Sequence, residues 1–177
     1  MILRRSFVLL LAALYMLTLA ACGKDDLAAP VEETEAAPET TPFGLVNPWA
    51  EADEAAVKAK FGITFSVPDG AKVVSYRIAD SLGIAEMRFT LDGVEWNARI
   101  AESEEFNDVS GMNYVWQKQE KAALGKISGS VRTCVADGKN VGVGLWHNPT
   151  MNMMFTLSAS SEKTLDFSIA GLVFPVK

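Results

Sequence analysis

The chain has 177 residues, of which 49% are hydrophobic and 21% are charged, and its formal net charge at pH 7 is −6. This length is sufficient for one domain with a substantial core. The acidic balance argues against nucleic acid or an anionic lipid surface as a partner. Two cysteines are too few for a disulfide framework, so the domain must depend on its apolar core.

The first 21 residues have the parts of a secretory signal peptide. Arg4 and Arg5 precede an apolar run from Phe7 to Ala21, which ends in small residues. The run has about 15 residues, whereas a transmembrane helix needs roughly 20. We therefore predict a cleaved signal peptide over residues 1–21 rather than a membrane-spanning helix.

The segment Leu19-Ala20-Ala21-Cys22 resembles the lipobox of bacterial lipoproteins. The resemblance implies that the Cys22 thiol is diacylated and that Cys22 becomes the first mature residue. Two or more acyl chains hold a protein stably on a membrane. We expect a lipid anchor on the extracytoplasmic face of a bacterial cell membrane. The removed segment takes two of the 16 basic residues and none of the 22 acidic ones, which leaves a net charge of about −8.

The next segment has the composition of a flexible linker. Residues 23–42 lack aromatic side chains and are rich in Ala, Pro, Glu and Thr. Such a segment buries too little apolar surface to offset the entropy lost on ordering. We therefore predict the lipidated Cys22 and a disordered acidic linker over residues 22–42, followed by a single domain over residues 43–177.

The domain begins with helix signals and then changes to strand signals. A helix that starts at Asn47-Pro48, or with Asp53 as its N-cap, is predicted to end at Gly62. Apolar residues then alternate over 61–67, which predicts a strand before the Pro68-Asp69-Gly70 turn. A further strand is predicted around Val74, Tyr76 and Ile78.

The strongest hairpin signal is Asp92-Gly93. A two-residue turn there places eight apolar residues on one face of the hairpin and polar residues on the other. The apolar cross-strand pairs are Leu91 with Val94, Phe89 with Trp96, Met87 with Ala98, and Ala85 with Ile100. The polar pairs are Thr90 with Glu95, Arg88 with Asn97, and Glu86 with Arg99, which includes one opposite-charge pair.

The second half of the domain predicts another antiparallel meander. A short strand over 114–119 precedes strands at about 126–135, 139–147 and 151–159, and the last three are joined by three-residue loops at 136–138 and 148–150. A helix over about 162–173, capped by Ser160 or Ser161, ends the domain. The predicted fold is α+β, an antiparallel β-meander sheet of about seven or eight strands with an N-terminal and a C-terminal helix.

Several short pieces spread along the chain carry a further resemblance. They are Asn47-Pro48-Trp49, Val67-Pro68-Asp69-Gly70-Ala71, residues 110–116 (SGMNYVW), Leu145-Trp146 and Thr164-Leu165-Asp166-Phe167. Through these pieces, most of 45–173 is similar to a group of small bacterial lipoprotein domains of unknown function. This resemblance implies a fold and an extracytoplasmic setting, and it implies no catalytic residues.

Three patterns of residue types used in catalysis or metal binding have simpler explanations. The predicted register places Cys134 and His147 far apart on opposite faces, which argues against a Cys–His nucleophile pair. Residues 160–163 match S-x-x-K without the companion motifs of penicillin-recognising enzymes, and helix capping accounts for the serine. The acidic loop 102–108 lacks the spacing of an EF-hand, so a solvated loop explains it better than calcium. No metal or cofactor is therefore predicted.

The predicted binding surface lies on the even-numbered face of the second meander. Glycines inside a strand can mark the close approach of a ligand, and the flanking side chains would supply an aromatic ring, a cation and a soft apolar group. Its residues are Arg132, Gly142, Gly144, Trp146 and Met154. We predict a noncatalytic binding module for an unknown extracytoplasmic ligand or protein. The alternatives are a hydrolase-like surface enzyme and a lipid or lipoprotein carrier.

Overall fold

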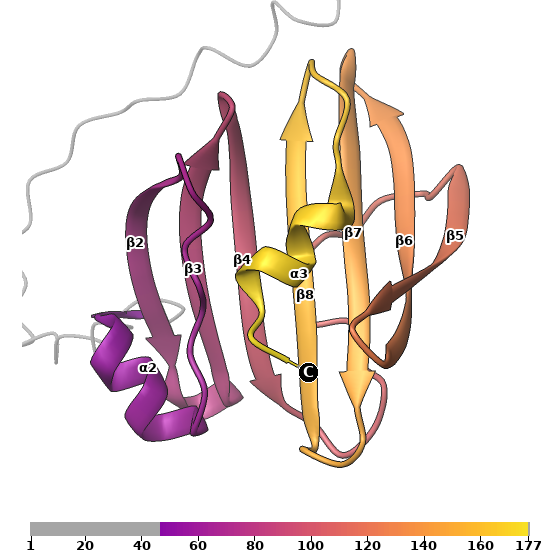
Figure 1. The fold of residues 1–177 in the computed structure, drawn as a ribbon. Coiled ribbons are helices and arrows are strands. Elements are labelled where there is room, and N and C mark those ends of the chain that lie inside the picture. The colour runs from indigo at the N-terminus through magenta and orange to yellow at the C-terminus, as the bar shows by residue number, and fades with distance from the viewer. Residues whose placement is uncertain (1–46, 177) are drawn as a thin grey trace, which may run out of the picture. The chain divides into compact units, whose positions relative to one another are not determined.

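A computed structural model describes residues 47–176 of the chain. The predicted signal peptide, the lipidated Cys22 and the linker lie outside the described residues. The described part is an eight-stranded antiparallel sheet in the order β1-β2-β3-β4-β8-β7-β6-β5 (Figure 1). The strands are β1 (Ala50–Ala52), β2 (Lys72–Ala79), β3 (Ile84–Leu91), β4 (Val94–Glu102), β5 (Lys118–Leu124), β6 (Ile127–Ala136), β7 (Lys139–Asn148) and β8 (Met153–Ser161).

The helices are short. They are α2 (Glu54–Phe61), α3 (Ala170–Val173) and the 3₁₀ turns η1 (Asp80–Leu82) and η2 (Phe167–Ile169). The predicted combination of sheet and helices is therefore correct only in its coarse form, because the sheet dominates. Within residues 47–176, no helix has the length and apolar character needed to cross a bilayer.

The sheet consists of two meanders that meet at one seam. Every pair of neighbouring strands is consecutive in the chain except β4 and β8. These two strands pair from Trp96 opposite Ala159 to Glu102 opposite Met153. The sequence predicted two successive meanders in one sheet, and the structure joins them edge to edge through β4 and β8.

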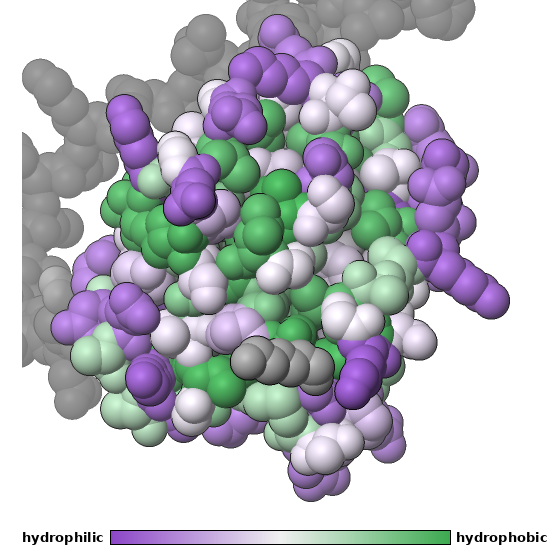
Figure 2. All heavy atoms as spheres, viewed as in Figure 1, coloured by the Kyte–Doolittle hydropathy of each residue, from purple (hydrophilic) through white to green (hydrophobic). Residues whose placement is uncertain are grey.

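One face of the sheet is apolar and carries the main core. Helix α2, the extended segment 62–71 and the C-terminal segment with α3 lie across this face (Figure 1). The buried side chains of this cover include Phe65, Val173 and Phe174. Figure 2 shows hydrophobic side chains gathered over the middle of this layer, with hydrophilic ones around them.

Of the two predicted helices, the first is confirmed in the alternative that begins at Asp53 and ends at Gly62, and the second is not. The Asp53 side chain accepts a hydrogen bond from the Ala56 N–H, so Asp53 is the N-cap of α2 and Asn47-Pro48 is not its start. Gly62 ends the helix at φ 71°, a conformation that glycine adopts without strain. The predicted helix 162–173 is wrong, because α3 has only four residues and the Ser161 Oγ accepts from Lys163 N–H outside any helix.

The Asp92-Gly93 hairpin is confirmed in its full register. Leu91 lies opposite Val94, and Phe89 lies opposite Trp96. Asp92 and Gly93 both have positive φ, as a two-residue turn matching the strand twist requires. Local turn chemistry and the period-2 pattern agree here, which is why the sequence specifies this hairpin.

The register predicted for β6, β7 and β8 is wrong. The β6–β7 turn has two residues, Asp137 and Gly138, because Ala136 pairs with Lys139. The β7–β8 turn spans four residues, 149–152, because Asn148 pairs with Met153. Both turns have an even length, so odd residues of β6 and β8 share a face with even residues of β7.

Two predicted strands are also corrected. Residues 61–67 form no strand; the Ser66 N–H instead donates to the Val173 carbonyl oxygen at 2.7 Å, above the sheet. The strand predicted at 114–119 is β5, shifted to Lys118–Leu124. The segment 103–117 connects the sheet's centre to its β5 edge and passes behind the sheet in the view of Figure 1.

Candidate binding groove

The predicted binding surface does not exist as one surface. Gly142, Gly144 and Trp146 lie opposite Ala159, Leu157 and Phe155, which places them on the apolar face. Arg132 and Met154 lie on the other face, because the turns have even lengths. The correction follows directly from the register.

The glycines make room for the protein's own aromatic rings. An added Cβ at Gly144 would overlap the indole of Trp146, and one at Gly142 would lie 2.8 Å from Phe167 Cζ. Trp146 is 1% exposed. The depression expected from these glycines is therefore already filled from within the chain, and Gly142, Gly144 and Trp146 belong to the core.

The other two predicted residues also have structural surroundings. Met154 is buried in a small cluster with Ile84 and Ala101. Arg132 Nη1 lies 3.6 Å from Oδ2 of Asp108, a residue of the crossing segment 103–117. Both side chains lie on the face opposite the glycines, so neither lines a common surface with them.

The patterns considered for catalysis remain apart. Cys134 pairs with Val141, and Trp146 pairs with Gly129, so Cys134 and His147 lie roughly 20 Å apart along the ladder. They share a face, which corrects the predicted placement, but they do not meet. The His147 Nε2 lies 3.1 Å from the Ser103 carbonyl oxygen.

The remaining two patterns form no site either. The Lys163 Nζ donates to the Asp92 carbonyl oxygen at 2.5 Å, so the lysine of the S-x-x-K pattern binds the Asp92-Gly93 hairpin turn. Within residues 47–176, no three acidic, histidine or cysteine side chains lie together as a metal site would require.

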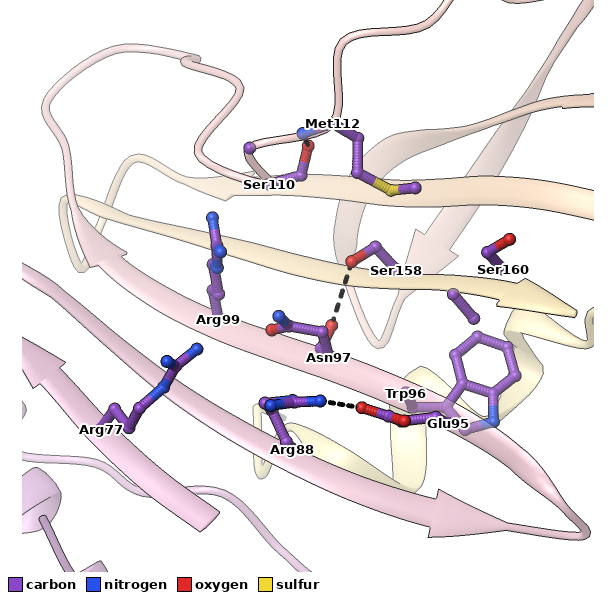
Figure 3. A pocket seen from close by; sticks show the side chains of 12 residues that line it. Arg77, Arg88, Glu95, Trp96, Asn97, Arg99, Ser110, Met112, Ser158 and Ser160 are labelled. Carbon is purple, nitrogen blue, oxygen red and sulfur yellow. Dashed lines mark hydrogen bonds and ion pairs between the residues drawn. The ribbon is translucent and has the colours of Figure 1, made fainter. Parts of the chain in front are cut away.

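A polar groove lies on the face of the sheet opposite the main core. Its floor consists of side chains from β2, β3, β4 and β8, and residues Ser110 to Met112 of the crossing segment form one wall (Figure 3). The groove encloses about 470 Å³ and is open to solvent. Its charged lining residues are Arg77, Arg88, Glu95 and Arg99, from three adjacent strands.

A fully buried carboxylate, Glu86, organises the groove floor. The guanidinium of Arg77 donates to Glu86 Oε1 from Nε, at 3.0 Å, and from Nη2. On the other side, Glu86 Oε2 accepts from Asn97 Nδ2 at 2.8 Å and from Arg99 Nε at 2.9 Å. Such charge-assisted hydrogen bonds hold both guanidinium groups in place.

These contacts keep Glu86 ionised. Burial raises the pKa of Glu86, but the hydrogen bonds from Arg77 and Asn97 and the charge of Arg99 outweigh it, and the pKa lies below its ordinary value. One buried carboxylate therefore faces two guanidinium groups. The cluster carries one positive charge in excess.

Trp49 stabilises this excess charge without neutralising it. The guanidinium carbon of Arg77 lies 5.1 Å from the Trp49 ring centroid, and that of Arg99 lies 5.2 Å from it. Both distances are within the range of cation–π attraction. A helix that started at Asn47-Pro48 would contain Trp49, but Trp49 precedes β1 and packs on this face instead.

The wall of the groove is held by its own hydrogen bonds. Asp108 Oδ1 accepts from the Ser110 N–H at 3.0 Å and from Ser110 Oγ at 2.6 Å, and Arg99 Nη1 donates to the Val109 carbonyl oxygen at 2.7 Å. Gly111 has φ 73°, and an added Cβ would lie 2.9 Å from Arg99 Nη1. The left-handed backbone favours glycine here, and any larger residue would also have to displace the end of the Arg99 side chain.

The rim of the groove carries an ion pair between Arg88 and Glu95, which is weaker than the contacts of Glu86 because it is more exposed. Arg88 Nη2 donates to Glu95 Oε1, and the side chains are 38% and 56% exposed. The sequence placed Arg88, Asn97 and Arg99 correctly on the polar face of the hairpin. It did not indicate that Trp49 and the segment 108–112 would enclose that face, since both are distant in the chain.

The chain matches no model of a protein family, no curated protein and no solved structure.

Proposed function

We propose that the chain is a noncatalytic binding module, held by a lipid on Cys22 at the extracytoplasmic face of a bacterial membrane, and that its ligand enters the arginine groove. The proposed membrane localisation rests on the signal-peptide pattern of residues 1–21 and on the Leu-Ala-Ala-Cys segment. The groove replaces the glycine-lined surface, whose volume is filled by Trp146 and Phe167.

One observation carries the binding proposal. Three guanidinium groups from adjacent strands converge on an open groove in a protein of net charge −6. Two of them are fixed by a buried carboxylate, so they are preorganised before any ligand arrives. Preorganised donors lose little conformational entropy on binding, which favours affinity.

The two alternatives have less support. A thiol hydrolase would need Cys134 and a base within hydrogen-bond reach, and His147 lies roughly 20 Å along the ladder from it. A lipid carrier would need an open apolar cavity. The apolar face of the sheet is instead packed with the side chains of its own cover, including Phe65 and Phe174.

The proposed lipid anchor is tested by Cys22→Ser. Serine offers no thiol for acylation, so we expect an unlipidated and unprocessed precursor. The measurement is the intact mass of the protein extracted from membranes, compared with wild type. Cleavage before residue 22 with acylation retained would overturn the lipobox assignment.

The proposed groove is tested by native mass spectrometry of the full-length protein extracted in detergent. Arg88→Gln removes a rim cation and leaves the Glu86 cluster in place. Lys118→Gln is the matched control, since Lys118 pairs with Glu120 on the edge strand β5, outside the groove. We expect the added mass of a bound ligand in wild type and in the control, and we expect this added mass to be absent in Arg88→Gln. No bound mass in wild type, or equal retention in all three proteins, would contradict the proposal.

A further inference from the structure

We propose that the arginine groove recognises an oxyanion, a carboxylate or a phosphate group on a small ligand. This inference rests on the proposed function, because it names the chemistry of the ligand that the groove would hold. It is carried by the hydrogen-bond donors that the groove leaves unused, by its charge and by its size.

The groove has free guanidinium donors. Arg77 uses Nε and Nη2 on Glu86, and Arg99 uses Nε on Glu86 and Nη1 on the Val109 carbonyl oxygen. Among residues 47–176 this leaves Arg77 Nη1 and Arg99 Nη2 without an acceptor. Arg88 bonds only Glu95, through Nη2, so its Nε and Nη1 are also unused within that range.

The charge of the groove matches an anion. Three guanidinium groups and two carboxylates, Glu86 and Glu95, leave one positive charge. The Trp49 ring attracts that charge but does not remove it. Arginine is also the side chain whose planar donors fit carboxylate and phosphate oxygens best.

Glu95 occupies the place that a ligand oxyanion would take at the rim. The Arg88–Glu95 pair is exposed, and exposed pairs contribute little free energy. A ligand oxyanion that also reached Arg99 would exchange for Glu95 at small cost. Glu86 is not exchangeable in this way, because it is fully buried and accepts four hydrogen bonds.

The groove is sized for a small molecule. Its volume of about 470 Å³ lies in the range typical of small-molecule sites, roughly 300–1,000 Å³. Met112 and the hydroxyl groups of Ser158 and Ser160 line it beyond the arginines (Figure 3). The ligand would therefore place its oxyanion at the arginines and a short, partly apolar body against Met112.

The inference is tested by nuclear magnetic resonance of the isotope-labelled full-length protein in detergent. The protein is titrated with sodium propionate, with sodium phosphate and with uncharged propionamide, at constant ionic strength. We expect propionate or phosphate to shift the amide signals of 110–112 and the guanidinium N–H signals. The stronger of the two identifies the source as carboxylate or phosphate. Propionamide should leave these signals unchanged.

Two variants localise the effect. Arg88→Gln should weaken the binding of the effective anion roughly tenfold, since a charge-assisted hydrogen bond is lost. Lys118→Gln, which changes the charge equally, should leave the affinity within about twofold, because exposed charges beyond a Debye length are largely screened. Amide spectra of the unliganded variants check that both remain folded. Equal weakening in both variants would show a general charge effect and overturn the inference.

The outcomes separate this inference from the proposed function. Bound mass that depends on Arg88, without any response to propionate or phosphate, would overturn the oxyanion assignment and leave the groove as the binding site. If uncharged propionamide shifted the same signals as strongly as the anions, the oxyanion assignment would also be overturned, and the groove would remain the binding site. Loss of both the bound mass and the anion response would overturn both proposals.

Discussion

The two faces of the sheet use opposite chemistry. The apolar face buries Met87, Trp96 and Phe155 under α2, the segment 62–71 and the C-terminal segment. The other face, over β2, β3 and β4, carries a buried carboxylate, two fixed guanidinium groups and an open groove. Both faces come from the same strands, because successive side chains point to opposite sides.

The difference between the faces separates stability from recognition. Burial of apolar surface stabilises the fold without direction or specificity. A buried charged cluster adds less net stability, since desolvation of the charges opposes their attraction. It holds donors in fixed orientations, however, which suits recognition. Substitutions on the two faces should therefore differ in size and in kind.

The largest effect is expected on the apolar face, for Trp96→Ala. Trp96 is 4% exposed and makes an edge-to-face contact with Phe167, with ring centroids 5.5 Å apart. Removing a large aromatic side chain from a core costs about 3–5 kcal/mol. Denaturant titration measures the change. A cost below that of the Glu86 variant would reverse the comparison of the two faces.

The next effect is expected on the polar face, for Glu86→Gln. Removing one partner of a fully buried ion pair costs about 3–5 kcal/mol. The Arg77 and Arg99 side chains are 28% and 16% exposed, and water compensates them in part. We therefore expect roughly 2–3 kcal/mol at neutral pH.

This cost should depend on pH. The folded-state pKa of Glu86 is lowered, so its stabilising contribution is present above the unfolded pKa and is lost as the pH falls through the folded pKa. The difference in unfolding free energy between wild type and Glu86→Gln should be largest near pH 7 and should shrink toward roughly pH 3. A difference independent of pH would mean that Glu86 acts by packing alone.

A smaller effect on the apolar face is expected for Gly144→Val. The added side chain must displace the Trp146 indole, and overpacking a core costs about 1–3 kcal/mol. Gly171→Ala is the control, because an added Cβ there meets nothing within 4 Å. Anion binding in the groove should be unchanged by Gly144→Val, since Gly144 lies on the opposite face.

The smallest stability effect is expected at the rim, for Glu95→Ala. The Glu95 side chain is 56% exposed, and surface changes of this kind alter stability by about 0.5 kcal/mol or less. The same change removes the carboxylate that competes for Arg88, so propionate or phosphate should bind more tightly. Weaker binding would show that Glu95 itself contacts the ligand.

The sequence predicted those parts of the fold that depend on neighbours in the chain. The Asp92-Gly93 turn and the alternating pattern of β3 and β4 determine one hairpin, and its register is confirmed. At Asp137-Gly138 the same turn chemistry was present, but a three-residue loop was predicted and every residue of β7 changed face. A shift of one residue in a strand reverses both of its faces.

The groove was not predictable by the same means. Its floor was visible as the polar face of the hairpin, with Glu86 opposite Arg99. Its burial depends on Trp49 and on the segment 108–112, and no local pattern indicates where these pack. Charged residues on a strand are usually solvated, so a buried carboxylate among them had no signal in the sequence alone.

The seam between β4 and β8 has a consequence for how the chain folds. Each meander is built from neighbouring segments, but β4 ends at Glu102 and β8 begins at Met153. Contacts across such separations form slowly, because loop closure must precede them. Until β8 docks, β4 is an unpaired strand edge, which is a template for pairing with another chain. During synthesis the β4 edge of the N-terminal meander therefore stays unpaired until β8 has been made. Until β8 docks, this edge can pair with another chain and aggregate.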